Sequence, residues 1–291
     1  MACVFRKITM RVYFNMFWPD FMTTNPVNYN FFIRLLSSIF ETDVEVSTNI
    51  QESDILVESM FGSIPLIGLK QWKYSFYYSG ENYVPNNSRY TAVLGGSTQY
   101  PNCIKLPQIL SYMYCGNLFT QFSRPIFQTS VPSLFACTVI SNPNGKVRNK
   151  FIQRMEDCGI RIDHGGKYKN NIGHTLGGDY NSPDMLSFFG KYKFAITMEN
   201  SLDTYYLTEK VCHGLQSGVI PVYWGSSHIH EYINPERILI LKSDSDEDMD
   251  ALIRHMVHMT ADEWLEIVKK PIFSRANLLE DAIKEIKTRI V

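Results

Sequence analysis

The feature that most limits the fold of this chain is a strand–helix–strand alternation in its second half. KFAITME (193–199) and VIPVYW (219–224) are apolar, strand-like runs, and the helix-like segment TEKVCHGLQS (208–217) between them is stopped by Gly218. Two strands joined by a crossover helix run parallel in one sheet. The sequence therefore predicts a β-α-β unit here, and with it an α/β fold.

The same alternation recurs along the rest of the chain. Expected strands and helices are MRVYFNMFW (10–18), NYNFFIRLLSSIF (28–40), DILVES (54–59), SFYYS (75–79), TAVLG (91–95), LFACTVIS (134–141), VRNKFIQRMEDC (147–158), GIRIDH (159–164), a helix from Pro183 and RILIL (237–241), with two helices at the end. The stretch 117–133 contains two prolines and little periodicity, which is typical of a linker. We predict two α/β domains, 1–130 and 131–291, with parallel sheets and a cleft between them.

Composition and charge exclude several classes of function. The 291 residues contain 28 Lys and Arg against 29 Asp and Glu, so no global positive field is available for nucleic acid or an anionic membrane. No window holds about 18 uninterrupted apolar residues, and the N-terminus lacks a signal-peptide pattern. The six cysteines are scattered without a CxxC pair, which is typical of reduced thiols. We expect a soluble, cytoplasmic protein with no transmembrane segment and no nucleic-acid partner.

Polar residues are unusually dense in MENSLDTYYLTEK (198–210), which follows a buried strand. Ligands of parallel α/β sheets bind at the carboxyl ends of the strands. Thr208 is expected to cap the next helix, and Lys210 in its first turn indicates a nearby anion such as a phosphate. Glu209 and Asn200 offer hydrogen bonds to sugar hydroxyls. The alternative is that Glu209 is an ordinary acid at a helix start and that Lys210 points to water.

Arg148 opens a helix one strand–helix unit earlier, so it is expected at the same edge of the sheet. A guanidinium there can bind a pyrophosphate through two points, although a solvated arginine at a helix start is the simpler interpretation. Glu81 lies just after a predicted strand in an aromatic-rich loop, where it is a candidate general base or a surface acid in a turn. No Walker lysine loop and no GxGxxG motif is present.

Two patterns could suggest a metal. Asp244-Ser245-Asp246 matches the DxD triplet of metal-dependent sugar transferases, but acids at the start of a predicted helix need no metal. The seven histidines show no metal-ligand spacing beyond the pairs 228/230 and 255/258. We therefore predict no metal site.

These residues together resemble a known family. YKFAITMENSLDTYYLTEKVCHGLQSGVIPVYWGSS (192–227) closely resembles the signature of the α-1,3/4-fucosyltransferase family, with its internal spacing kept. The resemblance extends through INPERILIL and back to GGKYKNNIG (165–173) and the Arg148 helix. YSGEN (78–82) looks like the acceptor-domain motif of the family. The similarity covers roughly the second half of the chain and is patchy before it.

The resemblance implies a GT-B fold, in which two Rossmann-like domains face a cleft and the C-terminal domain holds GDP-fucose. It implies inverting transfer of fucose to a sugar hydroxyl, such as O3 of GlcNAc or O3/O4 of a related sugar, with no essential metal or other cofactor. By motif position, Arg148, Asn200, Tyr206, Glu209 and Lys210 would bind the donor, and Glu81 would be the general base.

Alternatives remain for the donor and for activity itself. A GT-B transferase that uses another nucleotide sugar, such as GDP-mannose, would share most of these residues. An inactive glycan-binding module would be expected to lack Glu81 or the Glu209-Lys210 pair, and both are present. The last helix, NLLEDAIKEIKTRIV, carries mixed charge and is expected to pack back on the protein, with the first domain as a candidate surface, instead of binding a membrane.

Overall fold

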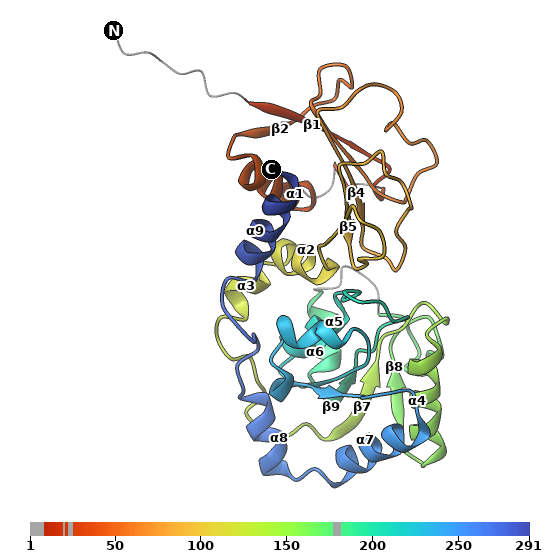
Figure 1. The fold of residues 1–291 in the computed structure, drawn as a ribbon. Helices are drawn as coiled ribbons and strands as arrows, with labels where there is room; N and C mark the ends of the chain where they lie inside the picture. Colours follow the sequence, from red (N-terminus) through yellow and green to blue (C-terminus); the bar gives the residue numbers. More distant parts are fainter. Residues whose placement is uncertain (1–8, 20, 23–25, 177–181) are drawn as a thin grey trace. The chain divides into compact units, whose positions relative to one another are not determined.

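The protein is described by a computed structural model that covers residues 9–19, 21–22, 26–176 and 182–291. The chain forms two compact units (Figure 1). One comprises residues up to Cys115 together with Thr204–Tyr206 and Asn277–Val291, and the other comprises Gly116–Asp203 and Leu207–Ala276. Each unit is built on its own parallel β-sheet.

The first unit contains a six-stranded sheet in the order β2-β1-β3-β4-β5-β6, with every neighbouring pair parallel. Its strands are β1 (Met10–Asn15), β2 (Val44–Val46), β3 (Ile55–Glu58), β4 (Tyr74–Ser79), β5 (Ala92–Gly95) and β6 (Cys103–Lys105). The helices α1 (Pro26–Phe40), α2 (Gln108–Cys115) and α9 (Leu278–Ile290) belong to the same unit, and α1 contacts both of the others (Figure 1). The central strands β3 and β5 are buried along their whole length, as expected for a parallel sheet covered on both faces.

The second unit contains a five-stranded parallel sheet in the order β11-β10-β9-β7-β8. Its strands are β7 (Leu134–Thr138), β8 (Ile162–His164), β9 (Tyr192–Ile196), β10 (Ile220–Tyr223) and β11 (Leu239–Ile240). Its helices are α3 (Leu118–Gln121), α4 (Lys146–Asp157), α5 (Pro183–Phe189), α6 (Lys210–Gln216), α7 (Asp246–His258) and α8 (Ala261–Val268), with the 3-10 turns η1 (Ser227–Glu231) and η2 (Pro235–Arg237). The predicted β-α-β unit is confirmed as β9, α6 and β10.

Several local predictions were wrong for identifiable reasons. The strands β2 and β6 were missed because three residues are too few to show an alternating pattern, and α2 was also missed. The stretch 117–133 contains the short helix α3. Three helices, not two, follow β11, and the last of them is α9. The predicted domain boundary at 130/131 remains a prediction, because the two compact units do not test it.

The structure describes five of the six cysteines and the helices that could be considered as membrane spans. Cys103, Cys115, Cys137, Cys158 and Cys212 are thiols that form no disulfide, and Cys3 lies outside the described residues. Burial raises the pKa of the Cys137 and Cys212 thiols well above the ordinary value, which makes them unreactive core groups. No helix within the described ranges has the length and apolar character needed to cross a membrane. The cytoplasmic location remains a prediction.

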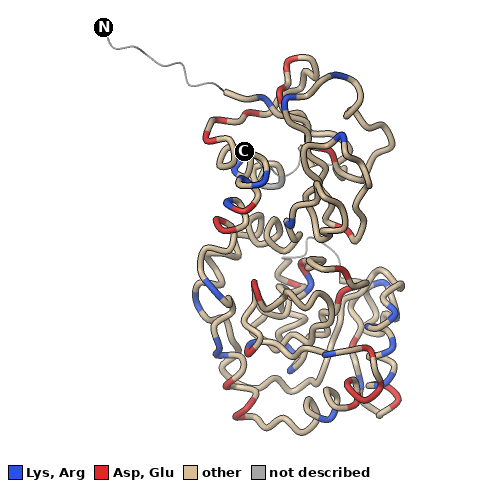
Figure 2. The backbone as a smooth tube through the Cα atoms, in the orientation of Figure 1, with Lys and Arg blue, Asp and Glu red and all other residues tan. Residues whose placement is uncertain are grey.

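Charge is distributed along both units without a segment of one sign dominating either (Figure 2). Acidic residues gather at the start of α7, where Asp246, Glu247 and Asp248 occupy the first turn and Ser245 caps the helix by accepting a hydrogen bond from the Asp248 amide. Asp246 pairs there with Lys150 at 2.7 Å and with Arg154 at 3.0 Å. The predicted helix start at the DxD triplet is confirmed, and the pairing of Asp246 with the cations of α4 is a feature that the sequence had not predicted.

Candidate functional site: the carboxyl edge of the second sheet

Four of the predicted site residues lie at the carboxyl ends of β7 and β9, which are neighbours in the second sheet. Arg148 is in the first turn of α4, after the loop that follows β7. Asn200 lies shortly after the end of β9, and Glu209 and Lys210 stand at the start of α6. Parallel strands end at one edge, so residues separated by 50 positions in sequence come together there.

Arg148 is buried, with 2% of its surface exposed, and its guanidinium is fixed by two acceptors. Its Nη1 donates to Asn200 Oδ1 at 2.5 Å, and its Nη2 donates to the Asn142 carbonyl at 2.7 Å. Gly145 gives the guanidinium room, because a Cβ on that residue would lie 2.7 Å from Nη2. The structure thus joins two residues that the sequence had marked independently.

Within the protein, Lys210 pairs with the carboxylate of Glu199, and the phosphate expected beside it stays a prediction. The Lys210 ammonium donates to Glu199 Oε2 at 3.1 Å and to Thr208 Oγ1 at 2.8 Å, and it lies 3.7 Å from Glu209 Oε1. Glu199 is fully buried, whereas a fifth of the Lys210 side chain is exposed. Glu199 was missed as a site residue, although its place beside Asn200 at the end of a buried strand was a usable signal.

Thr208 does not cap the helix, contrary to the prediction. α6 begins at Lys210, the residue in the capping position is Glu209, and that residue makes no side-chain capping bond. The Thr208 hydroxyl and backbone amide instead both donate to the Glu199 carboxylate, at 2.8 and 2.7 Å. The Thr208 hydroxyl, which was expected to cap the helix, therefore binds the Glu199 carboxylate instead.

Burial and charge shift the titration of this cluster. Burial raises the pKa of Glu199, and the Lys210 ammonium opposes that shift. Burial acts in the same direction on Glu209, but Lys210, His213 and hydrogen bonds outweigh it, so the pKa of Glu209 is lowered. Burial lowers the pKa of His213 to about 4, so this histidine on α6 is neutral at pH 7. The edge therefore carries two cations beside a closely packed set of acids.

The remaining predicted residues, Glu81 and Tyr206, lie in the first unit. Glu81 is exposed and lies two positions beyond the end of β4, as the sequence predicted. Tyr206 is buried, and its hydroxyl donates to Glu81 Oε2 at 3.4 Å. The chain is held there by the Tyr205 amide, which donates to the Gly96 carbonyl at 2.7 Å. Tyr206 thus contacts the candidate base.

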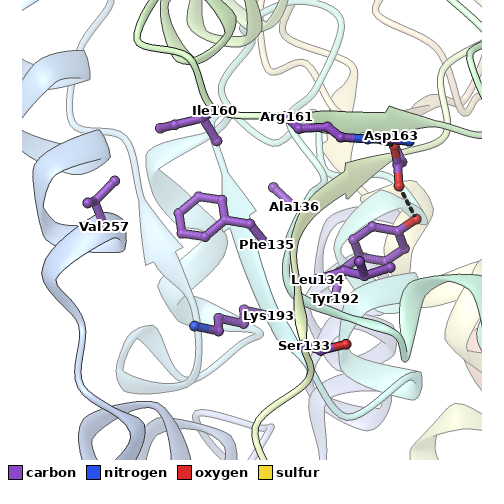
Figure 3. A pocket seen from close by; sticks show the side chains of 10 residues that line it. All are labelled: Ser133, Leu134, Phe135, Ala136, Ile160, Arg161, Asp163, Tyr192, Lys193 and Val257. Carbon is purple, nitrogen blue, oxygen red and sulfur yellow. Dashed lines mark hydrogen bonds and ion pairs between the residues drawn. The ribbon is translucent and has the colours of Figure 1, made fainter.

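A pocket of about 800 Å³ lies elsewhere on the second sheet (Figure 3). It opens at the amino ends of β7 and β9, beside the start of β8, and contains none of the predicted site residues. Its lining consists of Ser133, Leu134, Phe135, Ala136, Ile160, Arg161, Asp163, Tyr192, Lys193 and Val257. Asp163 accepts hydrogen bonds there from Tyr192 Oη at 2.8 Å and from Arg161 Nε at 2.9 Å.

In the described part of the chain, no group of three or more histidine, cysteine, aspartate or glutamate side chains is arranged to hold a metal ion. The cationic edge offers a guanidinium and an ammonium, which are the groups that proteins use to bind phosphates.

Arg148, Asn200, Glu209 and Lys210 lie within a segment that matches a known family. Residues 132–265 match the model of glycosyltransferase family 10 (fucosyltransferase), C-terminal domain. An α-(1,3)-fucosyltransferase of Helicobacter pylori is 34% identical over 102 residues, which is 35% of this chain and 20% of that protein. A GDP-fucose protein O-fucosyltransferase 3 of Danio rerio is 30% identical over 111 residues, or 36% of this chain and 23% of that protein. The matches thus span about a fifth of these relatives.

Solved structures extend the similarity in fold to the whole chain. A crystal structure of an α1,3-fucosyltransferase matches with a TM-score of 0.69 and 17% identity, over 98% of this chain and 91% of the other. The structure of an α1,3-fucosyltransferase with GDP-fucose matches with a TM-score of 0.67 and 18% identity, over 100% and 92%. At such identities the match shows the fold, and it confirms the predicted α/β, GT-B class.

Proposed function

We propose that this chain, which carries the C-terminal domain of the family 10 fucosyltransferases in residues 132–265, transfers fucose from GDP-β-L-fucose to a hydroxyl of a glycan acceptor. The observation that carries the proposal is the pair of cations at the carboxyl edge of the second sheet. Arg148 and Lys210 lie in the matched domain, and each is held by one of two consecutive residues, Asn200 and Glu199. Two fixed cations suit the diphosphate of a nucleotide sugar.

In this mechanism the donor is bound through Arg148, Asn200, Glu209 and Lys210. The bond between the anomeric carbon and the β-phosphate oxygen breaks, and GDP leaves with the electron pair. Lys210 and Arg148 stabilise the charge that grows on the diphosphate, so that no metal or other cofactor is required. Glu209 contributes hydrogen bonds to ribose or fucose hydroxyls.

Glu81 acts as the general base. Its carboxylate takes the proton of the acceptor hydroxyl while that oxygen forms the new bond to the anomeric carbon, which passes through an oxocarbenium-like state. A single displacement inverts the configuration and gives an α-fucoside. The hydrogen bond from Tyr206 orients the Glu81 carboxylate, and we assign Tyr206 this role in addition to the donor contact inferred from its motif position.

The acceptor is proposed to be O3 of GlcNAc or O3/O4 of a related sugar. A protein acceptor belongs in the same test, because one of the similar proteins is a protein O-fucosyltransferase by name. The two competing functions are a transferase that uses another nucleotide sugar, such as GDP-mannose, and an inactive glycan-binding module.

The test is acceptor-dependent GDP release by the purified protein, with GDP-fucose and GDP-mannose as donors and a panel of N-acetyllactosamine, Lewis-type precursors, simple galactosides and unfolded and folded protein acceptors. Glu81→Gln is expected to lower kcat by about 100-fold or more, because a general base contributes on that scale. Glu45→Gln is the matched control, since Glu45 is an exposed acid of the same unit that pairs with Arg11. It should leave kcat unchanged.

Release from GDP-mannose alone would move the proposal to the other donor, and no release from either would favour the binding module. Full activity of Glu81→Gln would remove Glu81 as the base. Repeating the assay with EDTA tests the metal-independent mechanism, which predicts an unchanged rate.

A further inference from the structure

The Glu199 carboxylate is a costly group in its position, because it has no exposure to solvent. Withdrawing a carboxylate from water costs several kcal/mol, which hydrogen bonds and a partner cation must offset. Glu199 has three such donors: the Thr208 amide at 2.7 Å, the Thr208 hydroxyl at 2.8 Å and the Lys210 ammonium at 3.1 Å. All three lie on the segment that leads into α6.

The surrounding backbone is shaped around this carboxylate. The Glu199 amide donates to the Trp224 carbonyl at 2.8 Å, which ties the residue to the end of β10. Gly225 lies beside it, and a Cβ there would come within 2.7 Å of Glu199 Cγ. The Glu199 backbone is therefore held by the end of the sheet, and both carboxylate oxygens accept hydrogen bonds from the segment at the start of α6.

These contacts form a series of hydrogen bonds that links Glu199 to Lys210. The ammonium donates to the Thr208 hydroxyl at 2.8 Å, and that hydroxyl in turn donates to Glu199. A flexible lysine is thus fixed through two acceptors, while a fifth of its side chain stays exposed. Buried ion pairs often contribute little to stability compared with apolar packing. The geometry of this pair therefore says more about its role than its stabilising energy does.

The neighbouring residue repeats the arrangement for the second cation. Asn200 Oδ1 accepts the hydrogen bond from Arg148 Nη1 at 2.5 Å. Consecutive residues at the end of β9 therefore each hold one cation, Glu199 through its carboxylate and Asn200 through its amide.

We propose that Glu199 is a positioning residue that fixes Lys210, through Thr208, for the diphosphate of the nucleotide. This inference rests on the proposed function. Glu199 acts through Lys210 and does not touch the ligand, because it is fully buried and its negative charge would repel a phosphate. Asn200 holds Arg148 through its side-chain oxygen, in addition to the donor contact proposed above.

A double-mutant cycle on nucleotide affinity tests the proposal. Glu199→Gln is expected to weaken GDP binding about tenfold, because misplacing a fixed group by a fraction of an ångström has effects of this order. Lys210→Met should weaken GDP binding further, and adding Glu199→Gln to it should cause no additional loss, since the two residues act through one contact. Guanosine, which lacks phosphates, should bind the native protein and the Glu199→Gln variant with equal affinity.

A merely structural role predicts a different pattern. Equal losses for GDP and guanosine, an undiminished Glu199→Gln effect in the Lys210→Met background, or no loss at all would overturn the proposal. Asp163→Asn is the matched control, because Asp163 is a buried carboxylate with hydrogen-bond partners on the same sheet, and GDP affinity should not change.

Thr208→Val gives a second variant if Glu199→Gln folds poorly. It removes the bridging hydroxyl and keeps both charges, and it should weaken GDP binding by less than Glu199→Gln, again only when Lys210 is present. A native protein that binds guanosine but gains nothing from the phosphates would overturn the inference. A native protein that binds neither would overturn the proposed function itself, before any variant is compared.

Discussion

The second sheet holds two buried carboxylates whose partner cations differ in exposure: Glu199, after the end of β9, and Asp163, in the middle of β8 beside the pocket on the amino side. At the carboxyl edge, Glu199 has no exposed side-chain surface and Lys210 is 20% exposed. On the amino side, the Asp163 side chain is 11% exposed, and its partner Arg161 is 82% exposed. One cation is held inside the protein, and the other extends into water beside a pocket (Figure 3).

This difference in exposure distinguishes the edge that we propose as the nucleotide site from the amino side of the sheet. An exposed cation keeps its hydration and can be replaced at little cost, whereas a buried cation needs neighbours that fix it. The pocket lies on the amino side, whereas the predicted donor-binding residues Arg148, Asn200, Glu209 and Lys210 lie at the carboxyl edge. We therefore place the proposed nucleotide site at the edge with the fixed cations.

The largest effect is expected from Arg148→Met, which removes a buried cation from the carboxyl edge. GDP affinity should fall about 100-fold, as for the loss of a charged hydrogen-bonding partner. The free energy of unfolding should change by only about 1 kcal/mol, because the lost hydrogen bonds are offset by the removed desolvation penalty. Calorimetric GDP titration and urea denaturation measure the two quantities.

Arg237→Met is the matched control for that change. Arg237 is also fully buried in the second unit, where it donates to the Val219 carbonyl at 2.9 Å and to the Ile126 carbonyl at 3.2 Å. Burial lowers its pKa to about 10. If both variants weakened GDP binding alike, the contrast between nucleotide-binding and structural arginines would be wrong.

An intermediate effect is expected from pH, through His213 on α6. Its pKa is about 4 in the folded protein, because burial disfavours the charged ring, against an ordinary 6.5. Between these values the unfolded chain binds a proton that the folded chain does not, so stability is present above pH 6.5 and falls as the pH is lowered. We expect about 2 kcal/mol less unfolding free energy at pH 5 than at pH 8 from this residue.

His213→Phe separates that contribution from the rest of the chain. A phenyl ring keeps the stacking on Phe189, whose ring centroid lies 5.9 Å away, but cannot titrate. Urea denaturation at several pH values should show a shallower loss for the variant than for the native protein. Parallel curves would exclude His213 as the source.

The smallest effect is expected on the amino side. Asp163→Asn removes the charge that Tyr192 and Arg161 contact, and it should lower the unfolding free energy by about 1 kcal/mol with GDP affinity unchanged. Arg161→Ala should leave the urea midpoint unchanged, because this side chain is mostly in water. A loss of GDP affinity in either variant would mean that the two edges are coupled.

Long apolar runs made much of the second sheet predictable. β9, β10 and the helix between them follow from the local sequence, because parallel strands buried on both faces show continuous apolar stretches. Short elements such as β2 and β6 carry no such signal, since their strand conformation depends on neighbouring strands. The edge at which Arg148 and Asn200 meet could be inferred because parallel topology puts strand ends together.

The sequence by itself determined the fold class and the resemblance of its second half to a known family, and it marked Arg148 and Lys210 as candidate cations of the site. Those properties depend on periodicity and motif spacing, which are local. Only the tertiary structure decided which partner each group has: Thr208 bonds to Glu199 instead of capping α6, Tyr206 contacts Glu81, and Glu199 holds Lys210. The reason is that a buried polar group takes whichever partner the packed chain brings within hydrogen-bonding distance.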